Sequence, residues 1–218
     1  GGKSTDNCSS LEIDDNNNIY LIGTTNSSNN IATVGSYKDI LPTGNVNGFI
    51  AKFKTDGTRL WGTYYGGENK YSTGDTCESG SVNKTNGDIY LIGNTRQITY
   101  YGTSNSFQPI NKGSDECYLS KFDTTGNLIW STFYGTPSQD YALNIYYKNN
   151  TIYAGGYSTG VATNGNNLGT PGTFMPDGGG YLYFIAKFQD CQTIVDANSN
   201  DPICTNNDLN FTATGGTN

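Results

Sequence analysis

The stretch Ile-Tyr-Leu-Ile-Gly occupies residues 19–23 and returns unchanged at residues 89–93. A looser copy, Ile-Tyr-Ala-Gly-Gly, follows at residues 152–156. The three copies therefore begin 70 and 63 residues apart. Self-similarity at such a regular spacing indicates a chain built from repeated supersecondary units, and the spacing is too long for one turn of a solenoid. The stretch thus predicts three copies of one larger unit.

Each of the first two repeats contains four strand-like segments separated by turn residues. Asn and Asp cluster after the first segment, and Asp-Gly between two apolar segments is a strong hairpin signal. The second repeat reproduces the parts of the first, and Trp130 follows Trp61 by 69 residues. In the first repeat the segments are residues 10–14, 19–25, 48–53 and 59–65, and in the second the matching segments include residues 89–93, 118–122 and 128–135.

Four antiparallel strands repeated along a chain with Gly-rich turns are typical of the blades of a β-propeller. Stacked blades cover both faces of one another, which explains why the second strands are continuously apolar. The third repeat has a third strand at residues 183–188 but no tryptophan-bearing fourth strand. We therefore predict an all-β fold with two complete blades and a third that lacks its last strand. As part of a larger propeller, this last blade would take its fourth strand from the N-terminal region of the protein. The blades are expected at about residues 1–66, 67–135 and 136–188.

Composition and charge argue against several classes of function. The 12 basic and 19 acidic residues give a net charge of −7, which disfavours binding to nucleic acid. No run of 18 apolar residues occurs, so we expect no transmembrane segment. The chain contains no histidine, which removes Ser-His-Asp, Cys-His and histidine-ligated metal sites from this chain. We therefore expect no catalytic residue, no metal and no cofactor.

Two alternatives for the acidic residues stay open. A pair of carboxylates could hydrolyse glycosides, although most of the Asp and Glu residues fall in turns, where Asp has a structural role. The acidic cluster at residues 14–18 could also be read as a calcium loop. It lacks the alternating ligands, the central Gly and the terminal Glu of an EF-hand, so a hairpin turn is the favoured interpretation.

The five cysteines are Cys8, Cys77, Cys117, Cys191 and Cys204. Cys8 and Cys77 occupy matching repeat positions, and each is expected to fill the same small core pocket. Cys191 and Cys204 are the candidates for a disulfide. A mass spectrum of the unreduced protein is expected to show that bond, and two free thiols there would contradict it.

Most of the 17 tyrosines are expected to pack between blades, where the ring is buried and the hydroxyl reaches an edge. Tyr100 and Tyr101 are the exception, because no periodicity explains this pair in a long loop. They are candidates for stacking on a ligand such as a sugar ring. Recognition would use the long loops at about residues 26–47, 96–116 and 158–181, since loops on rigid scaffolds commonly carry binding sites.

A family resemblance becomes specific at three segments of the first repeat. These are Asn-Ile-Tyr-Leu-Ile-Gly-Thr-Thr at residues 18–25, Phe-Ile-Ala-Lys-Phe at residues 49–53, and Asp-Gly-x-x-Leu-Trp-x-Thr-Tyr-Tyr-Gly-Gly at residues 56–67. Together they resemble the SBBP-type β-propeller repeat of bacterial extracellular proteins, over about residues 1–188. The resemblance implies a propeller of roughly six or seven blades. It carries over no catalytic residue.

Residues 189–218 are expected to form a linker and the start of another domain. The segment from Cys191 onward, with Leu-x-Phe-Thr-Ala-Thr-Gly-Gly-Thr at residues 209–217, is similar to the opening of Ig-like or PKD-like domains of Bacteroidota surface proteins. Such proteins are often adhesins or gliding-related proteins exported by the type IX secretion system. The resemblance implies a secreted or cell-surface location and a non-catalytic scaffold for binding or adhesion.

The expected partners are a surface glycan or protein, the remainder of the propeller, downstream Ig-like domains and the secretion machinery. The alternatives are a glycosidase that uses channel carboxylates and a purely structural spacer.

Overall fold

The computed structural model describes residues 1–41, 44–67, 74–104, 106–159, 182–190 and 210–211. Within these ranges the chain forms twelve β-strands and no helix. The strands are β1 (Asp6–Ile13), β2 (Ile19–Thr25), β3 (Asn47–Phe53), β4 (Arg59–Tyr65), β5 (Thr76–Val82), β6 (Ile89–Thr95), β7 (Glu116–Phe122), β8 (Leu128–Tyr134), β9 (Asp140–Lys148), β10 (Thr151–Ser158), β11 (Leu182–Gln189) and β12 (Asn210–Phe211).

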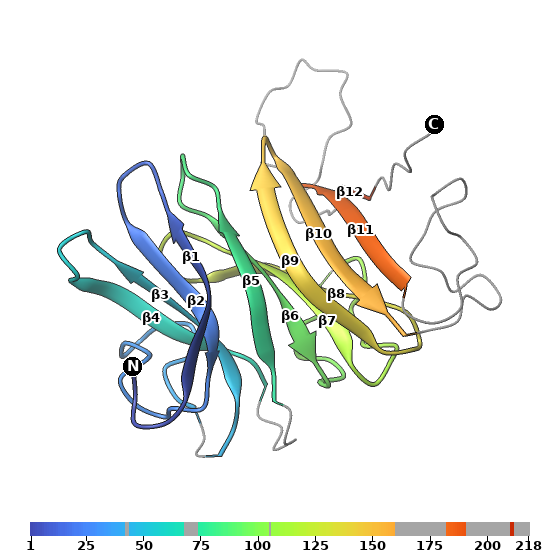
Figure 1. The fold of residues 1–218 in the computed structure, drawn as a ribbon, viewed down its shortest axis with the longest axis horizontal. Coiled ribbons are helices and arrows are strands. Elements are labelled where there is room, and N and C mark those ends of the chain that lie inside the picture. The colour runs from blue at the N-terminus through green and yellow to red at the C-terminus, as the bar shows by residue number, and fades with distance from the viewer. Residues whose placement is uncertain (42–43, 68–73, 105, 160–181, 191–209, 212–218) are drawn as a thin grey trace.

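The strands form three four-stranded antiparallel sheets, shown side by side in Figure 1. The first sheet has the order β1-β2-β3-β4, the second β5-β6-β7-β8, and the third β12-β11-β10-β9. The repeated stretch forms the second strand of each sheet, with neighbours on both sides. The predicted all-β fold with four-stranded antiparallel blades is confirmed.

The last glycine of the repeated stretch, at positions 23, 93 and 156, lies opposite a β-bulge in the first strand of its sheet. The bulge turns the backbone of that strand toward the glycine. A methyl group added at Gly23 would overlap the carbonyl oxygen of Asn7, and one added at Gly93 would overlap that of Thr76. The glycine is therefore required by a close backbone approach, as is common beside bulges.

The acidic cluster at residues 14–18 forms the turn between β1 and β2. The Asp14 carboxylate accepts hydrogen bonds from the backbone N–H groups of Asn16 and Asn18 at 3.0 and 2.8 Å. Asn17 has a positive φ of 60°, a conformation that Asn tolerates better than most residues. Burial alone would raise the pKa of Asp14, but these hydrogen bonds outweigh it and lower the pKa. The Asp14 carboxylate is therefore committed to a hairpin turn, as the favoured interpretation holds.

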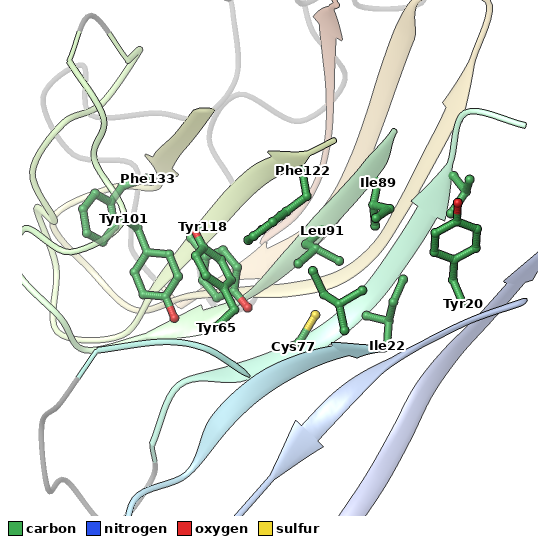
Figure 2. Packing of buried hydrophobic residues seen from close by; sticks show 12 residues of the cluster. Tyr20, Ile22, Tyr65, Cys77, Ile89, Leu91, Tyr101, Tyr118, Phe122 and Phe133 are labelled. Carbon is green, nitrogen blue, oxygen red and sulfur yellow. The ribbon is translucent and has the colours of Figure 1, made fainter. Parts of the chain in front are cut away.

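The sheets pack face to face through two cores. In the first core, shown in Figure 2, Tyr20, Ile22 and Tyr65 of the first sheet meet Leu91 and Phe122 of the second. The second core joins the second and third sheets. Its buried residues are Tyr90, Ile92, Cys117, Leu119, Trp130 and Tyr134 on one side, and Ala142, Ile145, Ile152, Ala154, Ala186 and Phe188 on the other. Each sheet thus uses one face toward the preceding sheet and the opposite face toward the following one.

The third sheet differs from the prediction in one detail. The sequence indicates no fourth strand there, yet β12 pairs antiparallel with β11, through Phe188 opposite Phe211 and Gln189 opposite Asn210. The strand escapes sequence analysis because it has two residues, follows a long insertion and carries no tryptophan. It also comes from the segment expected to begin an Ig-like domain. The rest of that segment, residues 191–209 and 212–218, lies outside the described residues.

In the part of the chain that the structure describes, no helix is long and apolar enough to cross a membrane.

Candidate functional site

The long loops between the second and third strands hold the outer edge of the first two sheets. In the first sheet, Thr33 N–H donates to the Gly62 carbonyl, and Tyr64 N–H donates to the Lys38 carbonyl, both at 2.9 Å. The second sheet repeats this pattern 70 loop residues later, with Thr103 and Gln108 in the loop, at 3.0 Å in each case. Each loop therefore covers an edge strand, β4 or β8, whose backbone groups would otherwise be open to pairing.

This edge role was not predicted for the loops at residues 26–47 and 96–116. It restricts recognition to the loop positions that point away from the strands. The third predicted loop, at residues 158–181, lies almost wholly outside the described residues.

Tyr101 is not a ligand-stacking residue, which corrects the prediction for the pair at 100–101. Its side chain is fully buried in the first core. The ring stacks on Tyr118 with centroids 4.0 Å apart, and meets Tyr65 edge to face at 5.0 Å. Figure 2 shows Tyr101 beside these rings. Because neighbouring residues in an extended segment point to opposite sides, only one of the two tyrosines could be exposed.

Tyr100 is the exposed member, and it lies beside a tyrosine of the neighbouring loop. The exposed fractions of Tyr100 and Tyr37 are 37% and 40%. Both rings lie 6.1 Å from the buried Tyr65 ring, measured between centroids. Partial burial and the neighbouring Tyr37 hydroxyl raise the pKa of Tyr100, so its hydroxyl stays protonated near neutral pH. We call Tyr37, Lys38 and Tyr100 the aromatic patch.

Lys38 adds a positive charge to the aromatic patch. Its ammonium group lies 5.7 Å from the centroid of the Tyr100 ring, within the range of a cation–π interaction. The same group donates hydrogen bonds to Asn47 Oδ1 at 3.1 Å and to the carbonyl oxygens of Gly66 and Gly67. These oxygens fix the ammonium group between the first two sheets. The patch therefore combines two half-exposed rings, two hydroxyls and a cation on a rigid support.

Sequence analysis missed Tyr37, although a signal for it existed. Tyr37 and Phe107 occupy the same position of the two loops, 70 residues apart, and each ring lies near the last tyrosine of its own sheet, Tyr65 or Tyr134. Aligning the loops, as well as the strands, would have identified an aromatic residue at this position in both repeats. Phe107 has no hydroxyl, and Gln108 follows it where Lys38 follows Tyr37.

The buried carboxylates lie at the same end of the sheets as these loops, and backbone and side-chain donors occupy them. Asp75 accepts from Gly67 N–H at 2.6 Å and from the Thr95 hydroxyl at 2.5 Å. Asp140 accepts from Thr136 N–H at 2.6 Å. Burial raises the pKa of both aspartates above its ordinary value.

Glu116 is also fully buried, with its pKa raised by burial, and it accepts from Lys112 N–H at 2.6 Å. A raised carboxyl pKa is typical of a general acid, but a general acid must also reach its substrate. The Glu116 and Asp140 side chains are hidden from solvent. In this arrangement they tie loops to strands.

Among the described residues, no group of three or more Cys, Asp or Glu side chains is placed to hold a metal ion. Of the described cysteines, Cys77 and Cys117 are buried free thiols, and burial raises the pKa of Cys77 to about 12. Cys8 is exposed, so the expectation that Cys8 and Cys77 share one environment is wrong. The reason is that a sheet packs over Cys77, whereas no described sheet packs over Cys8. The candidate disulfide between Cys191 and Cys204 lies outside the described residues and stays a prediction.

Comparison with known proteins identifies the repeat type. A family model described as SBBP, a beta-propeller repeat, matches residues 1–32, which comprise β1, β2 and the beginning of the following loop. No curated protein matches the chain. The chain therefore carries a β-propeller repeat of the SBBP type, and its four-stranded antiparallel sheets are blades of that fold.

Proposed function

We propose that the chain is a non-catalytic β-propeller scaffold that binds a glycan on or near a bacterial cell surface. The observation that carries the proposal is the aromatic patch, in which Tyr37 and Tyr100 are half exposed over a buried aromatic core. Partly exposed tyrosines with an apolar face and a free edge are well suited to stack on a sugar ring and bond its hydroxyls. The Lys38 ammonium group favours a sugar that bears a carboxylate.

The location is part of the proposal. An extracellular or cell-surface protein of Bacteroidota type, exported by the type IX secretion system and acting in adhesion or gliding, is consistent with the sequence resemblance of the repeats and of the tail. The net charge of −7 keeps such a protein soluble and disfavours binding to nucleic acid. A glycosidase is the less supported reading, since Asp75, Glu116 and Asp140 are buried and occupied by internal donors.

Binding of the chain to a glycan array is the direct test. Tyr37→Ala and Tyr100→Ala are each expected to weaken binding of the selected glycan at least about tenfold, a difference of roughly 1.4 kcal/mol. Phe107→Ala is the matched control, because Phe107 holds the Tyr37 position in the other loop. It is expected to leave affinity unchanged. Tyr100→Phe keeps the ring and separates stacking from hydrogen bonding by the hydroxyl.

Other outcomes have definite meanings. Unchanged affinity in the Tyr37→Ala/Tyr100→Ala double variant would contradict the patch as the binding site. Release of sugars from the bound glycan, abolished by changing one carboxylate, would establish the glycosidase instead. A chain that neither binds nor cleaves any glycan or surface protein would be a structural spacer.

A further inference from the structure

The first and third sheets each leave one apolar face uncovered by any described sheet. On the first sheet, this upstream face carries Leu11, whose exposed fraction is 60%, together with the exposed Ile13 and Cys8. On the third sheet, the downstream face carries Ile185, with an exposed fraction of 82%, and the exposed Tyr183, Tyr153 and Tyr146. Solvent-exposed apolar faces of this kind are typical of interaction surfaces.

The positions on the downstream face have buried counterparts in the other two sheets. Strand register places Tyr153 opposite Lys187, just as Tyr20 lies opposite Lys52 and Tyr90 opposite Lys121. Tyr20 and Tyr90 are fully buried, because each packs against the sheet that follows it. By the same register, Ile185 corresponds to Ile50 and Leu119, which are also fully buried. The downstream face thus repeats a surface that the chain covers twice.

The upstream face is the other half of the same interface. Cys8 corresponds to Cys77, and Ile13 to Val82, through the shared pairing of first and second strands. Cys77 and Val82 are buried against the preceding sheet, in the first core. The upstream face of the first sheet therefore has the composition that packs on a downstream face.

A polar contact marks each internal interface at a fixed position. Lys52 donates to Thr124 Oγ1 at 2.6 Å and to the Thr124 carbonyl at 3.2 Å. At the next interface, Lys121 donates to both oxygens of Asp190, at 3.2 and 3.0 Å. Thr124 and Asp190 both lie two residues after the third strand of the following sheet ends, at Phe122 and Phe188 in the pairing.

The matching residues on the open faces are available for this contact. Thr55 lies two residues after Phe53 of β3, and it is exposed. On the third sheet, no side-chain hydrogen bond joins Tyr153 or Lys187 to another described residue. One chain therefore carries the acceptor at one end and the donors at the other.

We propose that the two faces bind one another between copies of this chain, head to tail. The downstream face of one copy packs on the upstream face of a second copy, with Ile185 against the region of Leu11 and Ile13. Lys187 and Tyr153 then donate to Thr55 of the second copy, as their counterparts do within the chain. Such a contact joins different surfaces, so it extends into a closed ring or an open assembly. The proposal is independent of the glycan site.

Sedimentation of the purified chain under reducing conditions tests the proposal, and the reductant keeps Cys8 from forming an accidental disulfide. The wild-type chain is expected to associate as its concentration rises. Ile185→Glu and Leu11→Glu each place an unpaired charge in the apolar contact, and are each expected to weaken association about a hundredfold or more. Val34→Glu is the control at a fully exposed loop position, and is expected to have no effect.

A mixture of the two variants provides the decisive measurement. The Ile185→Glu chain keeps a working upstream face, and the Leu11→Glu chain keeps a working downstream face. Their mixture is therefore expected to form a one-to-one dimer that grows no further. A mixture that stays monomeric, a single variant that still associates, or a wild-type chain that is monomeric throughout would each overturn the proposal. Both sites are exposed, and circular dichroism confirms that the variants remain folded.

The polar contact gives a second, opposite readout. Thr55→Asp reproduces the Asp190 arrangement at the open interface, and is expected to strengthen association severalfold through an ion pair with Lys187. Lys187→Met is expected to remove that gain. A Thr55→Asp chain that associates no more tightly than wild type, with or without Lys187, would exclude the assigned register.

Discussion

Gly156→Ala is expected to lower the free energy of unfolding by about 3 kcal/mol, since overpacking beside a rigid backbone typically costs 1–3 kcal/mol and sometimes more. The added methyl group would overlap the carbonyl oxygen of Tyr141 and lie 2.6 Å from Phe184 Cζ. The carbonyl belongs to the bulged strand β9, whose hydrogen bonds hold it in place. Neither strand can move away without breaking its ladder.

Gly155→Ala is the matched control, one residue earlier in the same strand. The nearest atom to its added methyl group is 3.8 Å away, which is ordinary van der Waals contact. Its counterparts in the other sheets, Ile22 and Ile92, carry full side chains there. We expect a change of less than about 1 kcal/mol, in the stabilising direction, because alanine restricts the unfolded chain.

Urea denaturation followed by far-ultraviolet circular dichroism measures both variants, through the transition midpoint and its slope. The contrast between neighbouring glycines is the point of the comparison. Equal losses at the two positions would mean that backbone freedom, and not the close approach at the bulge, explains the glycine in the repeated stretch.

The repeated stretch shows how much of the fold the sequence can predict. Its apolar pattern and its spacing predict the second strand of each blade, and the strand bounds agree closely with the structure. The reason for its final glycine could not be predicted, because it depends on a bulge in another strand. Propensity describes one segment at a time, whereas a bulge is a property of the pairing between two.

The candidate site was predictable only in part. The pair at 100–101 stands out because it breaks the repeat, but alternation alone cannot say which tyrosine faces the core. That choice depends on Tyr118 and Tyr65, which come from other strands. The partner Tyr37 lies more than 60 residues earlier, and only the packing of two sheets brings its loop next to Tyr100.

Environment also depends on which neighbour covers a face. Cys8 and Cys77 match in sequence position and in strand register, yet one is exposed and the other buried. Repeat positions therefore predict which side of a sheet a residue occupies. They do not predict whether another sheet lies on that side, and this difference leads to the proposal that copies of the chain cover each other's open faces.

Lys121→Met is expected to lower the free energy of unfolding by about 3–5 kcal/mol, the usual cost of removing one partner from a buried ion pair. Asp190 is almost fully buried, and Lys121 and the Tyr90 hydroxyl both donate to it. Burial alone would lower the pKa of Lys121, but Asp190 and Asp88 outweigh it and raise the pKa. Without the lysine, the Asp190 carboxylate would remain buried with an uncompensated charge.

Lys52→Met is the control at the equivalent position, and it is expected to cost about 1 kcal/mol, the typical net value of a hydrogen bond. Lys52 donates to Thr124, a neutral residue, and burial lowers the pKa of Lys52. Methionine preserves most of the buried stem at either position. The difference between the two variants thus isolates the charge on Asp190 from the packing of the lysine.

The double variant Lys121→Met/Asp190→Asn completes the comparison in the same urea experiment. Removing both charges together is expected to restore most of the stability lost by Lys121→Met, since asparagine still accepts the hydrogen bond from Tyr90. If the double variant were as unstable as Lys121→Met, or if Lys52→Met cost as much, the stability of the second interface would depend on the lysine stem and not on the ion pair. The two interfaces would then be energetically alike, and Thr55→Asp would have no reason to strengthen the open one.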